Sequence, residues 1–476
     1  MTLDIAVLER LVDQVVREVA SQVERRAAIG TPSAPGTAHD GIFEDMDAAV
    51  KAAKQAHLAY LQCTMSDRRR FVAALRAMAL RPEVLDHLAT ATVEETGMGD
   101  VDDKRLKNKM VAELTPGVED LITEAWSGDA GLTTVEYSAF GVIGAITPTT
   151  NPTETLICNS IGMLAAGNSV VFSPHPRARQ VTLWLVRRFN EALAEAGAPP
   201  NLITMVREPT LEMTQSMMTH PDVRMLVATG GPGIVDMVLR SGKKAIGAGA
   251  GNPPVVVDET ADIDQAACDI VNGASFDNNL PCIAEKEVIV VDEVADLLIL
   301  HMKRHGAYEV KEPAVIARLH DLVFKTETQL KAEWVGQSAT KILDAVGVQA
   351  PAGTRLIIVE TGKDHPFVQR EMMTPILPVV RAKDVDTAIA IAIEVEHGNR
   401  HTAVMHSKNV SSLTRMARLI QTTIFVKNGP SYAGIGIGGE GYCSFTIAGP
   451  TGEGLTSART FARRRRCILV GDLNVR

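Results

Sequence analysis

The stretch Gly141-Val-Ile-Gly-Ala-Ile-Thr-Pro148 is an apolar run of strand length that ends in a loop. Similar apolar runs begin at Ser169, Leu202 and Val223, and amphipathic helix patterns such as residues 180–196 lie between them. Strands that alternate with helices form a parallel, doubly wound sheet, and ligands bind at the carboxyl ends of its strands. The sequence therefore predicts an α/β fold with a ligand crevice at the ends of these strands.

A helical section precedes these strands, and a second α/β section follows them. Residues 45–121 carry Ala-rich amphipathic turns with few β-branched runs, which favours helices. Residues 132–137 alternate between apolar and polar side chains and predict an exposed strand. Further strands are predicted at residues 254–258, 287–291, 355–359, 377–381 and 423–427. At 476 residues the chain is too long for one ordinary core, so two or three packed units are expected.

The composition is that of a globular protein without nucleic-acid or membrane partners. Hydrophobic residues make up 46% of the chain, and no window contains the unbroken apolar run that a membrane span requires. The formal charge of -9 argues against general nucleic-acid binding, which depends on many Lys and Arg side chains. The one dense basic run, residues 463–466, is interpreted as a polar strand or a subunit-contact edge.

The cysteines and histidines do not form a recognisable metal site. The six cysteines are scattered, with no CxxC pair, which indicates a reducing cytosol. His397 and His401 are four residues apart, but Gly398 and Asn399 weaken a helix between them and no third ligand is evident. We therefore expect a cytoplasmic protein without a metal or a disulfide framework.

The N-terminus carries an amphipathic pattern over residues 1–22, followed by a linker over residues 23–40 that is rich in Gly, Pro and Ser from Gly30 onward. It lacks the features of a secretory signal. A helix tethered in this way is either a frayed cap of its own domain or a docking peptide for a partner, and the linker favours docking.

Cys282 follows Phe276-Asp-Asn-Asn-Leu-Pro281, at the end of a predicted helix and just before the predicted strand 287–291. A thiol at such a loop mouth, close to backbone N–H groups, is expected to have a lowered pKa and to act as a nucleophile. Taken alone, Cys282 is better explained as a small buried hydrophobic residue. Its surroundings in the sequence decide the matter.

Three motifs carry a resemblance that covers nearly the whole chain from about Asp45. They are Ile146-Thr-Pro-Thr-Thr-Asn-Pro-Thr-Glu-Thr155, Ala166-Gly-Asn-Ser-Val-Val-Phe-Ser-Pro-His-Pro176 and Asn278-Asn-Leu-Pro-Cys-Ile-Ala-Glu285. In this order they resemble the aldehyde dehydrogenase superfamily, specifically the CoA-acylating propionaldehyde and acetaldehyde dehydrogenases of bacterial microcompartments. The resemblance implies an aldehyde dehydrogenase-like α/β fold, with a Rossmann-type nucleotide-binding domain, an α/β catalytic domain and a small β oligomerisation element.

The resemblance also implies a division of the chain and a set of partners. Residues 41–121 and 140–251 would form the nucleotide-binding domain, residues 252–442 the catalytic domain, and residues 122–139 with 443–476 the oligomerisation element. Exposed strands there would pair with another subunit in a homodimer or homotetramer. Residues 1–22 look like an encapsulation peptide that binds shell proteins, which implies a location inside a cytoplasmic microcompartment.

By the same resemblance, Cys282 takes the place of the family nucleophile, and its backbone N–H is one donor to the oxyanion. Alignment of the flanking prolines puts Thr150 where the superfamily usually has the second donor, an asparagine; Asn151, one residue later, is favoured over Thr150 for this role. The predicted dinucleotide contacts are Thr147, Pro148, Ser173, His175, Thr229, Gly230, Gly231, Ile234, Gly249 and Glu371, of which Glu371 matches the glutamate on the nicotinamide ribose.

Three positions depart from the hydrolytic relatives. Ser173 and Pro176 replace a lysine and a glutamate that grip the adenosine ribose, so looser NAD binding is expected. Gly247 replaces the glutamate that activates water against the thioester. Loss of such a base slows attack by water by about two to four powers of ten, whereas a CoA thiolate attacks a thioester without that help.

The implied reaction is ping-pong. The aldehyde adds to Cys282, hydride passes to NAD, NADH leaves, and coenzyme A removes the acyl group. Propanal is favoured as the substrate, and no residue decides between NAD and NADP. The alternatives are acetaldehyde as the main substrate, a non-acylating dehydrogenase that releases free acid, and a non-catalytic shell-associated protein.

Overall fold

The computed structural model describes residues 40–326 and 328–475. The helix expected at residues 1–22 and the linker up to residue 39 lie outside this part of the chain. Among the described helices, none combines the length and the apolar character needed to cross a membrane.

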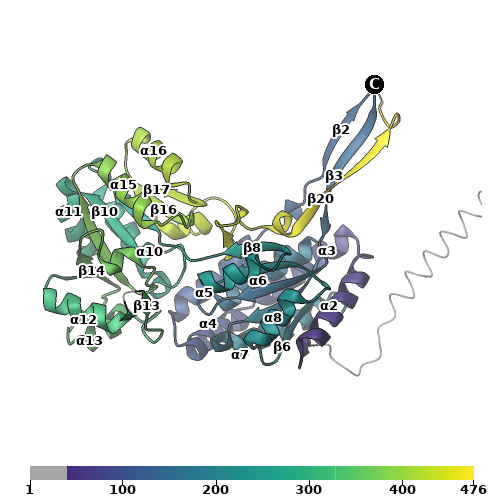
Figure 1. Ribbon diagram of the computed structural model, residues 1–476, viewed down its shortest axis with the longest axis horizontal. Helices are drawn as coiled ribbons and strands as arrows, with labels where there is room; N and C mark the ends of the chain where they lie inside the picture. Colours follow the sequence, from purple (N-terminus) through teal and green to yellow (C-terminus); the bar gives the residue numbers. More distant parts are fainter. Residues whose placement is uncertain (1–39, 327, 476) are drawn as a thin grey trace, which may run out of the picture. The chain divides into compact units, whose positions relative to one another are not determined.

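The strand quoted at the outset lies in the middle of a parallel sheet (Figure 1). It forms β4 (Val142–Thr147), which pairs with β5 (Ser169–Pro174) and β7 (Val223–Thr229). Within the described residues the sheet has the order β1-β6-β5-β4-β7-β8. Its remaining strands are β1 (Ile42–Phe43), β6 (Ile203–Val206) and β8 (Lys244–Ala248). Because all neighbouring pairs are parallel, the carboxyl ends of the strands meet at one edge.

Both faces of this first sheet are covered, which explains its unbroken apolar strands. Alternate residues of a strand point to opposite faces: Ile143 packs with one helical layer, and Val142 with the other. The first layer contains α3 (Met65–Ala79), α4 (Pro82–Thr96), α5 (Val101–Leu114), α6 (Pro152–Ala165) and α7 (Arg179–Glu195). The second contains α2 (Met46–Tyr60), α8 (Leu211–Thr219) and α9 (Pro232–Leu239).

A second parallel sheet follows in the chain, with the order β11-β14-β15-β10-β9-β16-β17 in the described residues. Its strands are β9 (Pro254–Val257), β10 (Glu287–Val291), β11 (Ala307–Val310), β14 (Leu356–Glu360), β15 (Ile376–Ala382), β16 (Thr402–His406) and β17 (Ile424–Lys427). The helices packed with it are α10 (Ile263–Ser275), α11 (Asp292–Arg304), α12 (Pro313–Val323), α13 (Ala339–Ala345), α14 (Pro366–Gln369), α15 (Val385–Val395) and α16 (Val410–Ile420). The predicted α/β fold class is confirmed.

In the two parallel sheets the sequence prediction missed four strands: β1, β8, β11 and β16. Strand β1 has only two residues, too few for any periodicity, and it owes its position to parallel pairing with β6. Strand β11 is an edge strand with partly exposed Tyr308 and Glu309. Strand β16 begins and ends with the buried polar residues Thr402 and His406. Tertiary pairing, rather than local pattern, makes these segments strands.

A three-stranded antiparallel sheet, which we call the arm, extends away from the first sheet (Figure 1). It consists of β2 (Glu124–Gly128), β3 (Gly131–Ala139) and β20 (Ala462–Val470). The predicted exposed strand at residues 132–137 lies in β3, and the basic run 463–466 lies in β20. Two short pairs complete the described strands: β12 (Phe324–Thr326) with β13 (Gln329–Leu330), and β18 (Ile447–Ala448) with β19 (Gly454–Leu455). Strand β18 packs against β8 rather than in the arm.

Candidate active site

A cavity of about 500 Å³ lies between loops of the two parallel sheets. The first sheet contributes loops at the carboxyl ends of β4, β5, β7 and β8, and the second contributes loops that precede β10 and β15. All the residues that the sequence predicted for the site line this one cavity: Cys282, Asn151, Thr150, Thr147, Pro148, Ser173, His175, Thr229, Gly230, Gly231, Ile234, Gly249 and Glu371. The candidate nucleophile therefore faces the candidate nucleotide loops.

Cys282 is partly exposed to this cavity, but its thiol is not activated in the way that the sequence suggested. Burial and, after it, the Glu371 carboxylate raise the pKa of Cys282 to about 12, against the opposing charge of Lys286. The expectation of a lowered thiol pKa was wrong. Desolvation disfavours the thiolate more than the neighbouring backbone N–H group favours it.

The backbone before Cys282 has an uncommon conformation. Asp277, Asn278 and Asn279 have φ angles of 48°, 54° and 66°, in the left-handed region. This conformation costs about 1–2 kcal/mol for each residue other than glycine. Each residue is held from outside: Asp277 by two lysines, Asn278 by the Gly336 carbonyl, and Asn279 by the carbonyls of α10 and Glu285. The run turns the chain from α10 to the cavity.

Lys286 supports the same loop from within. Its Nζ donates to the backbone oxygen of Asn279 at 2.8 Å, to Asn279 Oδ1 at 2.6 Å and to the Pro281 carbonyl at 3.3 Å. Burial lowers its pKa. Glu371, on the loop before β15, accepts a hydrogen bond from the Gly251 N–H at 3.3 Å, and burial raises the pKa of its carboxyl. Because this one hydrogen bond uses only one acceptor position, the Glu371 carboxylate has lone pairs left for a ligand.

Asn151 and Thr150 occupy different positions in the cavity wall. Asn151 is the residue that precedes α6, and its Oδ1 accepts a hydrogen bond from Lys107 Nζ at 2.6 Å. Its Nδ2 lies 3.2 Å from Thr150 Oγ1. The oxygen of Asn151 is thus already engaged, so its NH2 group is the part that can donate a hydrogen bond to an oxyanion.

The nucleotide loops offer hydroxyl and backbone groups rather than cations. The hydroxyls of Thr147 and Thr149 are buried without a partner in the described structure, and Ser173 Oγ lies 2.7 Å from Thr214 Oγ1. No Lys or Arg is among the described residues that line the cavity. A pyrophosphate would therefore depend on backbone N–H groups, such as those at the start of α9.

Gly247 lies within β8 and Gly249 directly after it, and their surroundings differ. A Cβ at Gly247 would lie 2.7 Å from Val235 Cγ1, closer than van der Waals contact allows. A Cβ at Gly249, which lines the cavity, would meet only Pro450 Cγ at 3.6 Å. A carboxylate at position 247 therefore has no room unless Val235 moves.

Several cavity residues were not identified from the sequence. Phe445, Thr210, Thr214 and Met373 line the cavity, although no local motif singles them out. His401, considered only as a metal ligand, is buried and neutral: burial lowers its pKa to about 4. A Cβ on Gly251 would lie 2.7 Å from the Cys282 carbonyl oxygen and 2.9 Å from the His401 ring, so glycine allows this close approach.

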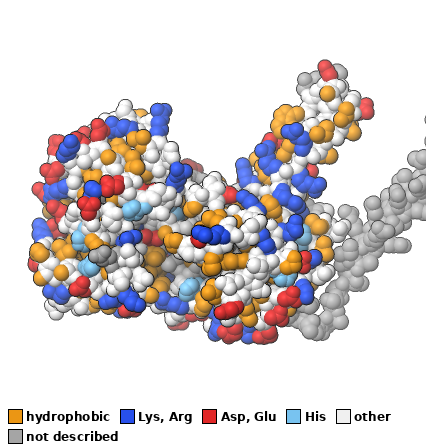
Figure 2. Space-filling view, in the orientation of Figure 1, with side chains coloured by type: hydrophobic (Ala, Val, Ile, Leu, Met, Phe, Trp, Pro, Cys, Tyr) orange, Lys and Arg blue, Asp and Glu red, His pale blue; other side chains and the backbone are white. Residues whose placement is uncertain are grey.

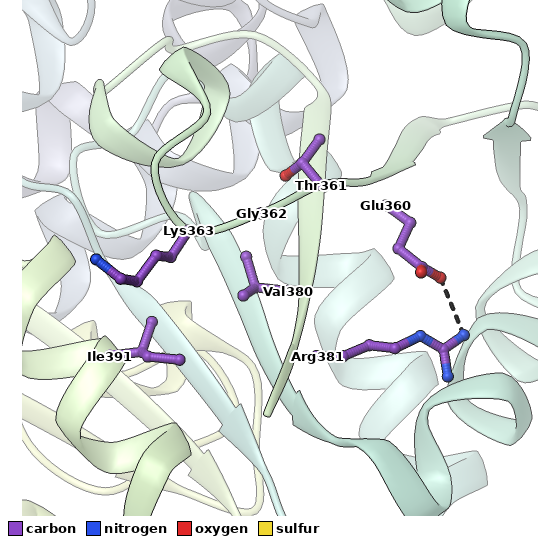
Figure 3. A pocket seen from close by; sticks show the side chains of 7 residues that line it. All are labelled: Glu360, Thr361, Gly362, Lys363, Val380, Arg381 and Ile391. Atoms are coloured by element: carbon purple, nitrogen blue, oxygen red, sulfur yellow. Dashed lines mark hydrogen bonds and ion pairs between the residues drawn. The ribbon is translucent and has the colours of Figure 1, made fainter. Parts of the chain in front are cut away.

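A second hollow of about 550 Å³ lies elsewhere on the second sheet, lined by residues near the ends of β14 and β15 and by Ile391 of α15 (Figure 3). Arg381 there is bound by Glu360, Asp292 and Asp296, and Lys363 by Glu394. These charges are satisfied by one another, so the hollow offers little to a charged ligand. Among the described residues, no His, Cys, Asp and Glu side chains group in a way that could hold a metal ion.

The sequence profile of the aldehyde dehydrogenase family matches residues 18–445. Together with the cysteine that faces the nucleotide loops, this match defines the class: the chain belongs to the aldehyde dehydrogenase family. It is 54% identical over 437 residues to the propanal dehydrogenase (CoA-propanoylating) of Salmonella typhimurium, which covers 92% of this chain and 93% of that protein.

Two solved structures are similar. A Rhodopseudomonas palustris propionaldehyde dehydrogenase with bound CoA and an acylated cysteine is 64% identical, with a TM-score of 0.91 over 92% of this chain and 100% of the other. A propionaldehyde dehydrogenase from the fucose utilisation bacterial microcompartment of Clostridium phytofermentans is 53% identical, with a TM-score of 0.90 and the same coverage.

The electrostatics of Cys282 predict how its reactivity depends on pH. Since burial and the Glu371 carboxylate raise the thiol pKa to about 12, alkylation by iodoacetamide should be slow at pH 7 and rise about tenfold per pH unit up to pH 10. Glu371→Gln removes a negative charge, lowers the thiol pKa and should speed alkylation about threefold to tenfold at pH 8.

The rate is followed by mass spectrometry on the peptide that contains Cys282, because Cys467 is exposed and also reacts. Glu440→Gln, which removes a charge from an exposed loop position, is the matched control. Equal rates in the Glu371→Gln variant and the wild type would contradict this account of the thiol.

Proposed function

We propose that this chain is an NAD-dependent, CoA-acylating aldehyde dehydrogenase that converts a short aldehyde, with propanal favoured, to its acyl-CoA. The observation that carries the proposal is Cys282 in one cavity with Glu371 and the loops after β4, β5 and β7. The names of the Salmonella relative and of the R. palustris structure support the choice of propanal and of CoA.

The reaction begins with the addition of the Cys282 sulfur to the aldehyde carbon. The thiol must first lose its proton, and the Glu371 charge opposes that loss. Hydroxyl groups that donate to the Glu371 carboxylate would weaken its field at the sulfur and favour the thiolate. The Lys286 charge favours the thiolate. The arrival of a ribose at Glu371 would thus prepare the nucleophile.

The addition creates an oxyanion, which the backbone N–H of Cys282 and Asn151 Nδ2 would hold. NAD, when bound, accepts the hydride that leaves the same carbon and so converts the hemithioacetal into a thioester. The dinucleotide would be held through hydroxyls and backbone N–H groups, which come from Thr147, Ser173, Thr229 and the start of α9. The absence of cation partners among the described lining residues favours loose binding and early release.

The last step transfers the acyl group from sulfur to sulfur. The CoA thiolate attacks the thioester carbon, the carbon–sulfur bond to Cys282 breaks, and the Cys282 thiolate leaves. Water competes poorly because position 247 is a glycine packed under Val235, with no carboxylate to activate water. Glu371 is the one carboxylate among the described cavity residues.

The wild-type protein should form propanoyl-CoA and NADH when propanal, NAD and CoA are all present. Cys282→Ala should lower the rate at least a thousandfold, because the described lining of the cavity contains no second thiol. The measurement is NADH absorbance with product identification by mass spectrometry. If the protein releases free acid at an undiminished rate when CoA is left out, the non-acylating alternative is favoured. If no NADH forms under any condition, the non-catalytic alternative is favoured. If the rate is faster with acetaldehyde than with propanal, only the proposed main substrate changes and the proposed reaction stands.

We also propose that the arm joins subunits of a homodimer or homotetramer. Trp126 and Ile468 flank Thr133 across the three strands, so both project from one face, and each is more than half exposed. Figure 2 shows hydrophobic side chains along the arm. Exposed apolar residues on an edge sheet are typical of a subunit contact.

Trp126→Glu combined with Ile468→Glu should shift the protein to a lower mass in light scattering at micromolar concentration, because a charge at each position opposes burial. Ser127→Glu, which changes the opposite face of β2, is the control and should leave the mass unchanged. An unchanged mass in the double variant would exclude this face as the contact.

The N-terminal pattern supports a further proposal, that residues 1–22 direct the protein into a microcompartment; this segment lies outside the described residues. The microcompartment origin of the C. phytofermentans relative supports it. Deletion of residues 1–30 should leave turnover within about twofold, since the segment is tethered by a linker, and should abolish co-purification with shell proteins. Unchanged co-purification would refute the targeting role.

A further inference from the structure

Two lysines lie buried behind the candidate active site. Lys104 and Lys107 are one turn apart on α5, and both side chains are completely inaccessible to solvent. Neither lines the cavity. Lys104 Nζ pairs with Asp277 Oδ2 at 3.0 Å, and Lys107 Nζ pairs with the same oxygen at 2.5 Å and with Glu154 Oε1 at 2.9 Å. Two positive and two negative charges thus balance inside the protein.

Lys107 has three partners around its ammonium group. It donates to Asp277 Oδ2 at 2.5 Å and to Asn151 Oδ1 at 2.6 Å, and Glu154 Oε1 forms an ion pair with it at 2.9 Å. Burial opposes its charge, but Asp277 and Glu154 outweigh this effect and raise the pKa of Lys107. Lys107 is therefore a permanent cation, and each of its contacts is charge-assisted.

The contact with Lys107 determines which way the Asn151 amide points. An ammonium group only donates, so the atom that faces Lys107 must be the oxygen of Asn151. The NH2 group of Asn151 is consequently turned toward Thr150 Oγ1, and both residues line the cavity. Without Lys107, rotation of the amide by half a turn would present an acceptor to an oxyanion, which would repel it.

The same lysine touches the two other walls of the site. Asp277 begins the left-handed run that leads to Cys282, and its Oδ2 is shared between Lys107 and Lys104. The Phe445 ring, which lines the cavity, lies 5.7 Å from Lys107 Nζ. One ammonium group therefore contacts the segment of the oxyanion donor, the segment of the nucleophile and an aromatic wall.

We propose that Lys107 is a positioning residue, which holds the Asn151 amide as an oxyanion donor and fixes it relative to the loop that carries Cys282. The inference rests on the proposed function. Stability alone does not explain such a group, because a buried ion pair is often no more stabilising than apolar residues of similar volume. An apolar side chain at position 107 could not donate the hydrogen bond that orients the Asn151 amide.

The test is a double-mutant cycle of Lys107→Met and Asn151→Ala. Asn151→Ala should lower kcat about 100- to 1000-fold, as the loss of an oxyanion donor does. Lys107→Met should lower kcat about 10- to 100-fold through misplacement of that donor, with KM for propanal and NAD within about threefold. The double variant should lie within about threefold of Asn151→Ala alone, because Lys107 acts through Asn151.

Lys104→Met is the matched control. It removes the other ammonium group from Asp277 and its hydrogen bond to the Thr150 carbonyl at 3.1 Å, but leaves the contact between Lys107 and Asn151. Its thermal stability should fall as far as that of Lys107→Met, with a smaller loss of kcat. Should Lys107→Met fail to fold, Lys107→Arg replaces it in the cycle, because it keeps the charge while altering the geometry at Asn151.

The results separate the inference from the proposed function. If the wild type forms acyl-CoA and the effects of Lys107→Met and Asn151→Ala simply multiply in the double variant, Lys107 has only a structural role and the inference fails alone. Equal losses of kcat in Lys104→Met and Lys107→Met would overturn it as well. A wild type without acyl-CoA formation would overturn both.

Discussion

The buried ion pair between Lys107 and Asp277 is the constraint on which the candidate site depends. It joins α5, in the helical layer of the first sheet, to the loop that precedes β10 in the second. The three left-handed residues of that loop are unfavourable in isolation and persist because the surrounding contacts hold them. With this pair in place, the carboxyl ends of the first sheet and the amino end of β10 face the same cavity.

In the candidate site, positively charged side chains lie behind the cavity wall and not on its surface. The described lining residues include Glu371 but no Lys or Arg, whereas Lys104, Lys107 and Lys286 are buried immediately behind the wall. Cations placed there act on the thiol and the amide through the protein and do not bind phosphate directly. A ligand that carries a pyrophosphate would then be held by weak, numerous contacts, which suits the proposed release of the dinucleotide before CoA enters.

Much of this arrangement could be predicted from the sequence. Strand-helix alternation identified the α/β class and most strands, because buried parallel strands have unbroken apolar runs. The motifs identified the candidate site residues, and in the structure all of these residues line one cavity. The pattern of residues 45–121 could not distinguish Lys104 and Lys107 from ordinary solvent-facing lysines, since their partners Asp277 and Glu154 are 173 and 47 positions away. The four strands missed in the parallel sheets were likewise formed by pairing with neighbouring strands rather than by a local pattern.

The thiol pKa shows most clearly why local sequence is insufficient. A loop mouth with backbone N–H groups suggests a thiolate, but the desolvation of Cys282 and the Glu371 charge act in the opposite direction and prevail. Both effects come from side chains that are distant in sequence. The same two effects explain how the site could remain unreactive while empty: a protonated sulfur resists oxidation and alkylation. Hydroxyl groups that donate to Glu371 would weaken the effect of its charge on the thiol. Binding of a nucleotide at these loops would therefore favour ionisation of Cys282.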